Sequence, residues 1–128
     1  MSSNTLSKEE KRSMGDQLEK RMGVFGGRIT QIVDALAENP TQRHVRDQLL
    51  RSGTAPGAHY AEARSAQSNK DFVHKVSLAA KEASEARYWL RVVQHAGSVE
   101  MDVSEAIDEV DQLVAILVSS LQTARDGT

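Results

Sequence analysis

Apolar residues recur along most of the chain at alternating spacings of four and three, the pattern of a helix that buries one face. The first run consists of Leu18, Met22, Phe25, Ile29, Ile32 and Leu36. Two later runs are Phe72, Val76, Ala79, Ala83, Ala86, Leu90 and Val93, then Val103, Ile107, Val110, Val114, Leu117 and Leu121. No segment shows the alternation of period two that predicts a strand.

Residues that favour helix ends divide this pattern into four helices. The start signals are Ser7 with Glu10, Asn39 before Pro40, Ser68 with Asp71, and Asp102 with Glu105, and Gly97 is a stop signal. The predicted helices span about 8–38, 40–66, 69–96 and 103–124. Because the turns between them are short, the sequence predicts one all-α domain over residues 1–128, an up-down-up-down antiparallel four-helix bundle.

The second and third helices form a hairpin about a turn near Ser68. Both arms rise equally per residue, so Arg51 is expected opposite Glu85, and Glu62 opposite His74. We predict a structural ion pair between Arg51 and Glu85. A catalytic role is disfavoured, because an arginine lowers the pKa of a carboxylate and so weakens it as a base.

A second face of the third helix lies roughly a quarter turn from its apolar seam. It carries Leu78, Glu82, Glu85 and Trp89. One interpretation is a subunit interface formed by Leu78, Glu82 and Trp89, with the carboxylates available for pairing between subunits. The other is that Trp89 packs at the edge of its own bundle.

Charge is distributed unevenly around a net value of −2. Residues 43–91 hold nine basic and five acidic side chains, whereas residues 92–128 hold one basic and seven acidic ones. The two segments can pair with each other. Alternatively, the hairpin places four arginines at one end of the bundle as a candidate nucleic-acid patch, namely Arg43, Arg46, Arg87 and Arg91. Glu100 and Asp102 are expected nearby and would reduce the positive charge of this patch.

The sequence predicts no catalytic residue, metal site or cofactor. It contains no cysteine, which excludes disulfides and thiol nucleophiles. Asp71 and His74 have the spacing of a di-metal bundle, but the last helix lacks histidine. Gly23, Gly26 and Gly27 follow no strand, so they do not predict a phosphate-binding loop. With no membrane-length apolar run and no signal peptide, we expect a cytoplasmic protein without membrane contact.

Several separated motifs occur in order along the hairpin. They are Leu50-Arg51-Ser52-Gly53-Thr54, Tyr60-Ala61-Glu62-Ala63, Lys70-Asp71-Phe72, Lys81-Glu82-Ala83, Glu85 and Tyr88-Trp89-Leu90. This set resembles the signature of the four-helix bundle proteins of the 23S ribosomal RNA intervening-sequence family, and the likeness extends from about Gln17 to Ala124.

The resemblance implies a ring-shaped homopentamer, and most of the family has no established biochemical activity. The similar accessory variability proteins of diversity-generating retroelements bind a reverse transcriptase and nucleic acid, but they are strongly basic, whereas this chain has a pI near 6.1. We therefore predict a non-enzymatic oligomeric scaffold or adaptor whose partners are its own copies and a further protein or nucleic acid. The alternative is a nucleic-acid-binding accessory factor of a reverse transcriptase or ribonucleoprotein complex.

Overall fold

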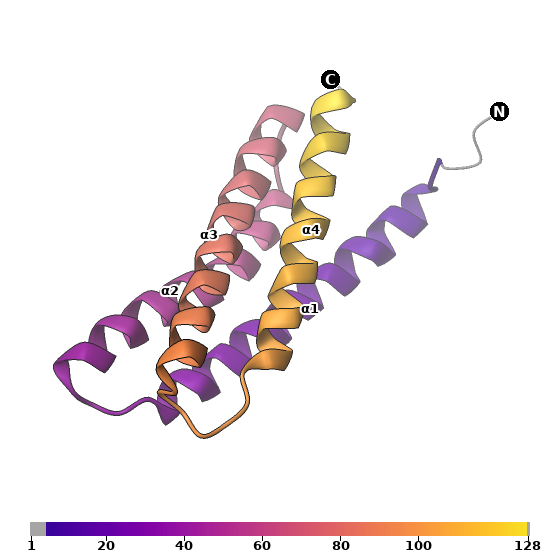
Figure 1. Cartoon of the computed structure of the whole chain (residues 1–128). Coiled ribbons are helices and arrows are strands. Elements are labelled where there is room, and N and C mark those ends of the chain that lie inside the picture. The colour runs from indigo at the N-terminus through magenta and orange to yellow at the C-terminus, as the bar shows by residue number, and fades with distance from the viewer. Residues whose placement is uncertain (1–4, 128) are drawn as a thin grey trace.

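The computed structural model describes residues 5–127, in which all regular structure is helical. The helices are α1 (Lys8–Ala35), α2 (Pro40–Ala63), α3 (Asn69–Ala96) and α4 (Ser104–Asp126). Successive helices run in opposite directions along the bundle (Figure 1). The prediction of an all-α fold with four helices is confirmed.

Four helix ends differ from the expected positions. α1 stops at Ala35 because Leu36 adopts an extended backbone with ψ of 140°. α2 stops at Ala63, since the N–H groups of Ser65 and Ala66 donate to carbonyls three residues back and form a turn. α4 begins at Ser104 and continues to Asp126. Asp102 still serves this helix start, because its Oδ1 accepts a hydrogen bond from the Ser104 N–H at 2.9 Å.

The turn of the central hairpin follows the predicted capping. The Ser68 hydroxyl accepts a hydrogen bond from the Asp71 N–H at 3.0 Å. At the far end of α3, Gly97 has φ of 62°, the left-handed conformation that glycine adopts most easily. These two residues fix the length of α3 and therefore which of its side chains lie opposite α2.

Most of the core comes from the predicted apolar seams, with the seam of α3 at its centre. Ala79, Ala83 and Ala86 are fully buried, so small side chains allow the neighbouring helices to approach. Two predicted seam residues, Phe72 and Val114, are only partly buried. Residues outside these seams complete the core, among them Leu49 and Tyr60 of α2 and Leu113 of α4.

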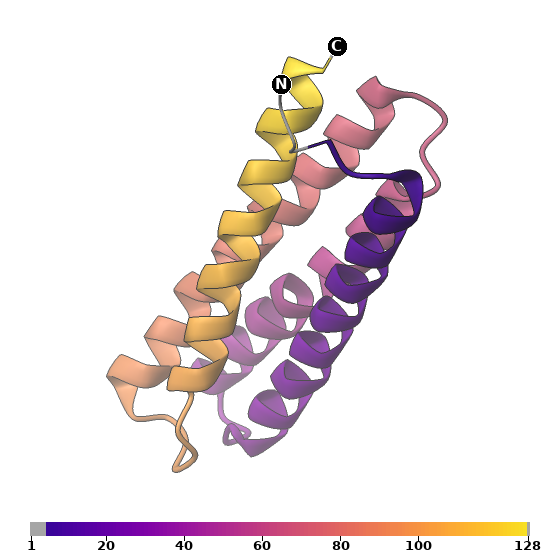
Figure 2. The same ribbon diagram turned by 90° about the vertical axis from the view of Figure 1, so that its right-hand side faces the viewer.

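The four sides of the bundle are packed unequally. α1 packs along α2, α2 along α3 and α3 along α4, but α1 and α4 have few contacts with each other. Figure 2 views the molecule from the side of α1 and α4. The helices follow one another around the bundle in chain order. The side formed by α2 and α3 therefore lies opposite the side formed by α1 and α4.

Candidate functional site

The α2–α3 side carries a cluster of charged groups centred on Arg51. Its Nη1 donates to Glu82 Oε1 and Oε2 at 2.7 and 2.9 Å, and its Nη2 donates to Glu85. Glu82 and Glu85 are three residues apart on α3 and therefore share a face. The hairpin brings Arg51 to that face, so the structure contains the expected Arg51–Glu85 contact and adds Glu82 to it.

The charges in this cluster stabilise one another in their ionised forms. The hydrogen bond from Arg51 lowers the pKa of Glu85, and a hydrogen bond from the Trp89 indole N–H at 3.1 Å lowers it further. Hydrogen bonds to Glu85 and Glu82 raise the pKa of Arg51. A carboxylate held in this way is a weak base, which agrees with a structural role.

Trp89 lies at the edge of the bundle and is partly buried against the core. Its ring makes edge-to-face contacts with His44 of α2, at a centroid distance of 5.6 Å, and with Tyr88, at 5.1 Å. Tyr88 itself is 58% exposed. Leu78, three turns before Trp89 on the same face, is also partly buried. Leu78 and Trp89 are therefore packed within their own chain and still present part of their surface to solvent.

Equal rise in the two arms of the hairpin predicts the contacts less accurately at the other end of the α2–α3 side. Glu62 pairs with Lys75 at 3.6 Å and lies 3.7 Å from His59 Nδ1, instead of meeting His74. Lys75 is partly buried whereas His74 is exposed, so helix rotation turns the neighbouring residue towards α2. Equal rise fixes the level of a residue along the bundle and leaves its direction to the rotation of the helix.

The four arginines of the predicted patch lie on two different sides of the bundle. Arg46 donates to Glu38 at 2.9 Å, in the connection between α1 and α2, and Arg43 acts on the same carboxylate. On the other side, Arg87 and Arg91 share Asp111 of α4, at 3.2 and 3.8 Å. The carboxylates in contact with these arginines are thus Glu38 and Asp111, and a weakening of the patch by Glu100 and Asp102 stays a prediction. Each of the two pairs of arginines lies beside one carboxylate.

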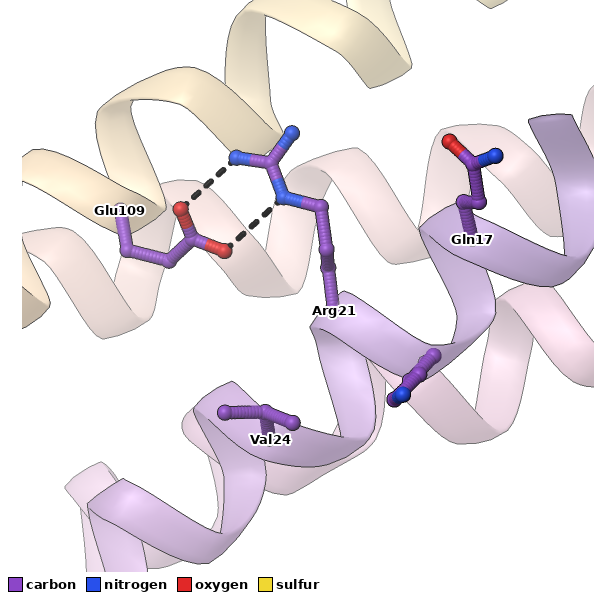
Figure 3. A pocket seen from close by; sticks show the side chains of 5 residues that line it. Gln17, Arg21, Val24 and Glu109 are labelled. Carbon is purple, nitrogen blue, oxygen red and sulfur yellow. Dashed lines mark hydrogen bonds and ion pairs between the residues drawn. The ribbon is translucent and has the colours of Figure 1, made fainter.

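The α1–α4 side contains an apolar groove that the sequence analysis did not identify. Its volume is about 340 Å³, and it is lined by Gln17, Lys20, Arg21, Val24 and Glu109. Arg21 closes one flank by donating from Nη2 and Nε to the two oxygens of Glu109, at 2.7 and 3.1 Å (Figure 3). Arg21 and Glu109 are polar and far apart in sequence, so no periodicity could have paired them.

Two further observations limit the chemistry. Within residues 5–127, no group of three His, Asp or Glu side chains is arranged to hold a metal ion. The same part of the chain has no helix with the length and apolar content needed to cross a membrane.

Comparison with known proteins identifies the family. Residues 20–119 match the sequence model of the family described as 23S rRNA-intervening sequence protein. The chain belongs to this family. The match includes every site residue predicted above. It confirms the family resemblance carried by the hairpin motifs.

One solved structure shows the same fold in a relative. It is a protein of unknown function from the S23 ribosomal protein family of Bacteroides thetaiotaomicron VPI-5482. The two sequences are 28% identical, the alignment covers 84% of this chain and 97% of the other, and the TM-score is 0.76. No curated protein matches the chain. The comparisons therefore identify the family and the fold, and they name no activity.

Proposed function

We propose that this member of the 23S rRNA-intervening sequence family is a non-enzymatic scaffold or adaptor that assembles with copies of itself. The observation that carries the proposal is the loosely packed α1–α4 side. Val24 there is 67% exposed, more than any other large hydrophobic side chain among residues 5–127, and it lines the apolar groove. Covering it with a second copy would contribute about 1.5 kcal/mol or more per contact.

A homopentameric ring is the expected form. The number five rests on the resemblance to ring-forming family members, and the tendency to associate rests on the exposed groove. A ring needs two different contact surfaces on each chain, and the groove would be one of them.

The non-enzymatic part of the proposal rests on how the charged groups are used. Arg51 engages both Glu82 and Glu85, and Arg21 engages Glu109 through both carboxylate oxygens. Carboxylates paired in this way stabilise contacts between helices. They are poor general bases, because the paired arginine favours the ionised form.

Light scattering coupled to gel filtration tests the proposal. The wild-type chain should have the mass of an oligomer at micromolar concentration, and Val24→Glu should dissociate it by placing a charge in an apolar contact. Thr30→Glu is the matched control, because Thr30 is exposed on another face of α1. A monomeric wild type, or equal dissociation by both variants, would refute self-assembly through this side.

The alternative function, an accessory factor that binds nucleic acid, would use a different part of the surface. Arg87 and Arg91 have one carboxylate between them, as do Arg43 and Arg46. Two arginines beside a single carboxylate support weak attraction to phosphates that salt screens readily.

A further inference from the structure

We infer that the outward face of α3 is a docking surface for an acidic helix of another protein. We call this face the outer stripe, and it consists of eight residues: Lys70, His74, Ser77, Lys81, Ser84, Tyr88, Arg91 and His95. The inference rests on the adaptor part of the proposed function and names the class of partner that the adaptor would hold.

The outer stripe runs along the length of α3 on the side away from the core. Its first seven members each precede a residue of the apolar seam by two positions, as Lys81 precedes Ala83 and Tyr88 precedes Leu90. Two positions turn a helix by about 200°, so the stripe faces outward where the seam faces inward. None of its eight residues is buried, whereas Ala83 and Leu90 are fully buried. The stripe is therefore a continuous surface on the outside of the bundle.

The outer stripe carries positive charge that few contacts within the chain take up. It has three lysine or arginine side chains, Lys70, Lys81 and Arg91, and no carboxylate. Arg91 lies 3.8 Å from Asp111, which also pairs with Arg87. Among residues 5–127, no ion pair includes Lys70 or Lys81.

The positive charge persists when the neighbouring carboxylates are counted. α3 holds five lysine or arginine side chains and three acidic ones, a surplus of two in a chain whose net charge is −2. Two of the three acids, Glu82 and Glu85, are in contact with Arg51 of α2, and Lys81 acts on Glu85 at longer range. The outer stripe is therefore the surface of α3 that attracts an acidic partner.

The spacing of the three cations fits a helix better than a nucleic acid. Lys70, Lys81 and Arg91 are 11 and 10 residues apart, which is close to three helical turns, or about 16 Å. A helix that lies along α3 therefore meets each cation if it has a carboxylate every three turns. Duplex DNA carries one charge per about 1.7 Å of its axis. Three cations along about 32 Å would leave most of those phosphates without a partner.

The surface between the cations suits the packing of a second helix. Ser77 and Ser84 are small, partly buried and seven residues apart, so they leave room at heptad spacing for larger side chains of a partner. The Ser77 hydroxyl donates to the His74 carbonyl at 2.7 Å and keeps this bond when it is covered. Tyr88 is 58% exposed, and its ring packs edge-on against Trp89. An aromatic ring held in this way can anchor an apolar side chain of the partner.

Fluorescence anisotropy with a labelled synthetic peptide tests the inference. The spaced peptide has 28 residues, the length of α3, and consists of alanine, leucine and glutamine with a glutamate every three turns. One control peptide has glutamine in place of each glutamate, and another has its glutamates in consecutive positions. At about 0.1 M salt, charges more than about 10 Å apart are largely screened. The spaced peptide should then bind roughly tenfold more tightly than either control, since each exposed ion pair contributes up to about fivefold.

Substitutions in the outer stripe locate the binding surface. Lys81→Glu replaces an attraction by a repulsion at the middle cation and should weaken binding of the spaced peptide by about tenfold. Lys81→Gln, which adds no carboxylate, should weaken it by about two- to fivefold. Tyr88→Ala should weaken it by about fivefold or more. Lys11→Glu is the matched control, because it changes the net charge equally at an exposed residue of α1 and should alter binding by less than about twofold.

The outcomes separate this inference from the proposed self-assembly. A spaced peptide that binds no better than its controls overturns the docking surface, as does equal weakening by Lys11→Glu and Lys81→Glu in chains with native circular dichroism. Binding of labelled single-stranded RNA that Lys81→Glu abolishes, without binding of the spaced peptide, overturns it too and identifies a nucleic-acid surface. A monomeric wild type that binds the spaced peptide refutes self-assembly and leaves the docking surface standing. An oligomeric wild type that does not bind it has the opposite meaning.

Discussion

Two glycines in consecutive helices should respond in opposite ways to the addition of a single methyl group. Gly53 of α2 faces α1, where a Cβ would lie 2.6 Å from Ile29 Cγ1 and 2.7 Å from Ile29 Cγ2. Ile29 is fully buried and branched at Cβ, so it cannot rotate away. Gly23 of α1 has no atom within 4 Å of its Cβ position. The same substitution therefore tests packing at one site and backbone freedom at the other.

The magnitudes follow from these contacts. Overpacking a core costs about 1–3 kcal/mol, and the short distances at Ile29 favour the upper value. Alanine regains about 1 kcal/mol through its higher helix propensity. Gly53→Ala should therefore lower the free energy of unfolding by about 2 kcal/mol. Gly23→Ala meets no neighbour and should raise it by about 0.5–1 kcal/mol.

Urea denaturation followed by circular dichroism measures both changes. The expected loss at Gly53 corresponds to a midpoint roughly 1 M lower in urea. All variants should be compared at one protein concentration, because the stability of an oligomer depends on concentration. If Gly53→Ala is as stable as the wild type, α1 and α2 do not approach closely at Ile29, and the packing described here is wrong.

Three other predictions concern charged residues. Arg51 is 48% exposed, so Arg51→Met should cost about 0.5–1 kcal/mol, and its combination with Glu85→Gln should cost less than the sum in a double-mutant cycle. The folded-state pKa of Glu85 is lowered, so its contribution to stability is present above about pH 4.5 and is lost as pH falls through the lower folded value. Glu85→Gln should therefore flatten the decrease in urea midpoint between about pH 6 and about pH 3. Fluorescence anisotropy with labelled single-stranded RNA and duplex DNA should show weak binding at about 50 mM salt that is lost at about 200 mM. Submicromolar binding at the higher salt would favour the nucleic-acid alternative.

The apolar seams could be predicted because their periodicity is long and regular. Leu18, Ile29 and Leu117, for example, are all buried where the pattern places them. Contacts between neighbouring helices could be predicted in part, since the capped turn at Ser68 sets the level at which Arg51 meets Glu85. The Arg21–Glu109 contact could not be predicted from the sequence, because no turn joins α1 to α4 and neither residue belongs to an apolar pattern.

The arginine patch shows why level alone is insufficient to predict a surface. Arg46 and Arg87 do lie towards the same end of the bundle, as the hairpin requires. Their partners, Glu38 and Asp111, lie on different sides of it. Direction around a helix changes by about 100° per residue, so a small error in rotation moves a side chain from one seam to the next. A surface composed of several helices therefore needs the packed structure.

The uneven packing of the bundle has a physical cause in the first turns of α1. Arg64, at the end of α2, pairs with Asp16 at 2.8 Å and Glu19 at 3.0 Å and donates to the Arg12 carbonyl at 3.3 Å. Its guanidinium lies over Gly15, where a Cβ would be 2.9 Å from Nε, so the absence of a side chain permits this contact. These bonds fix α1 to α2, whereas Arg21 supplies the polar link to α4 through Glu109 and Gln112. α1 is thus tied closely to α2 and is joined to α4 by fewer contacts, and the groove beside Val24 lies on this more loosely packed side.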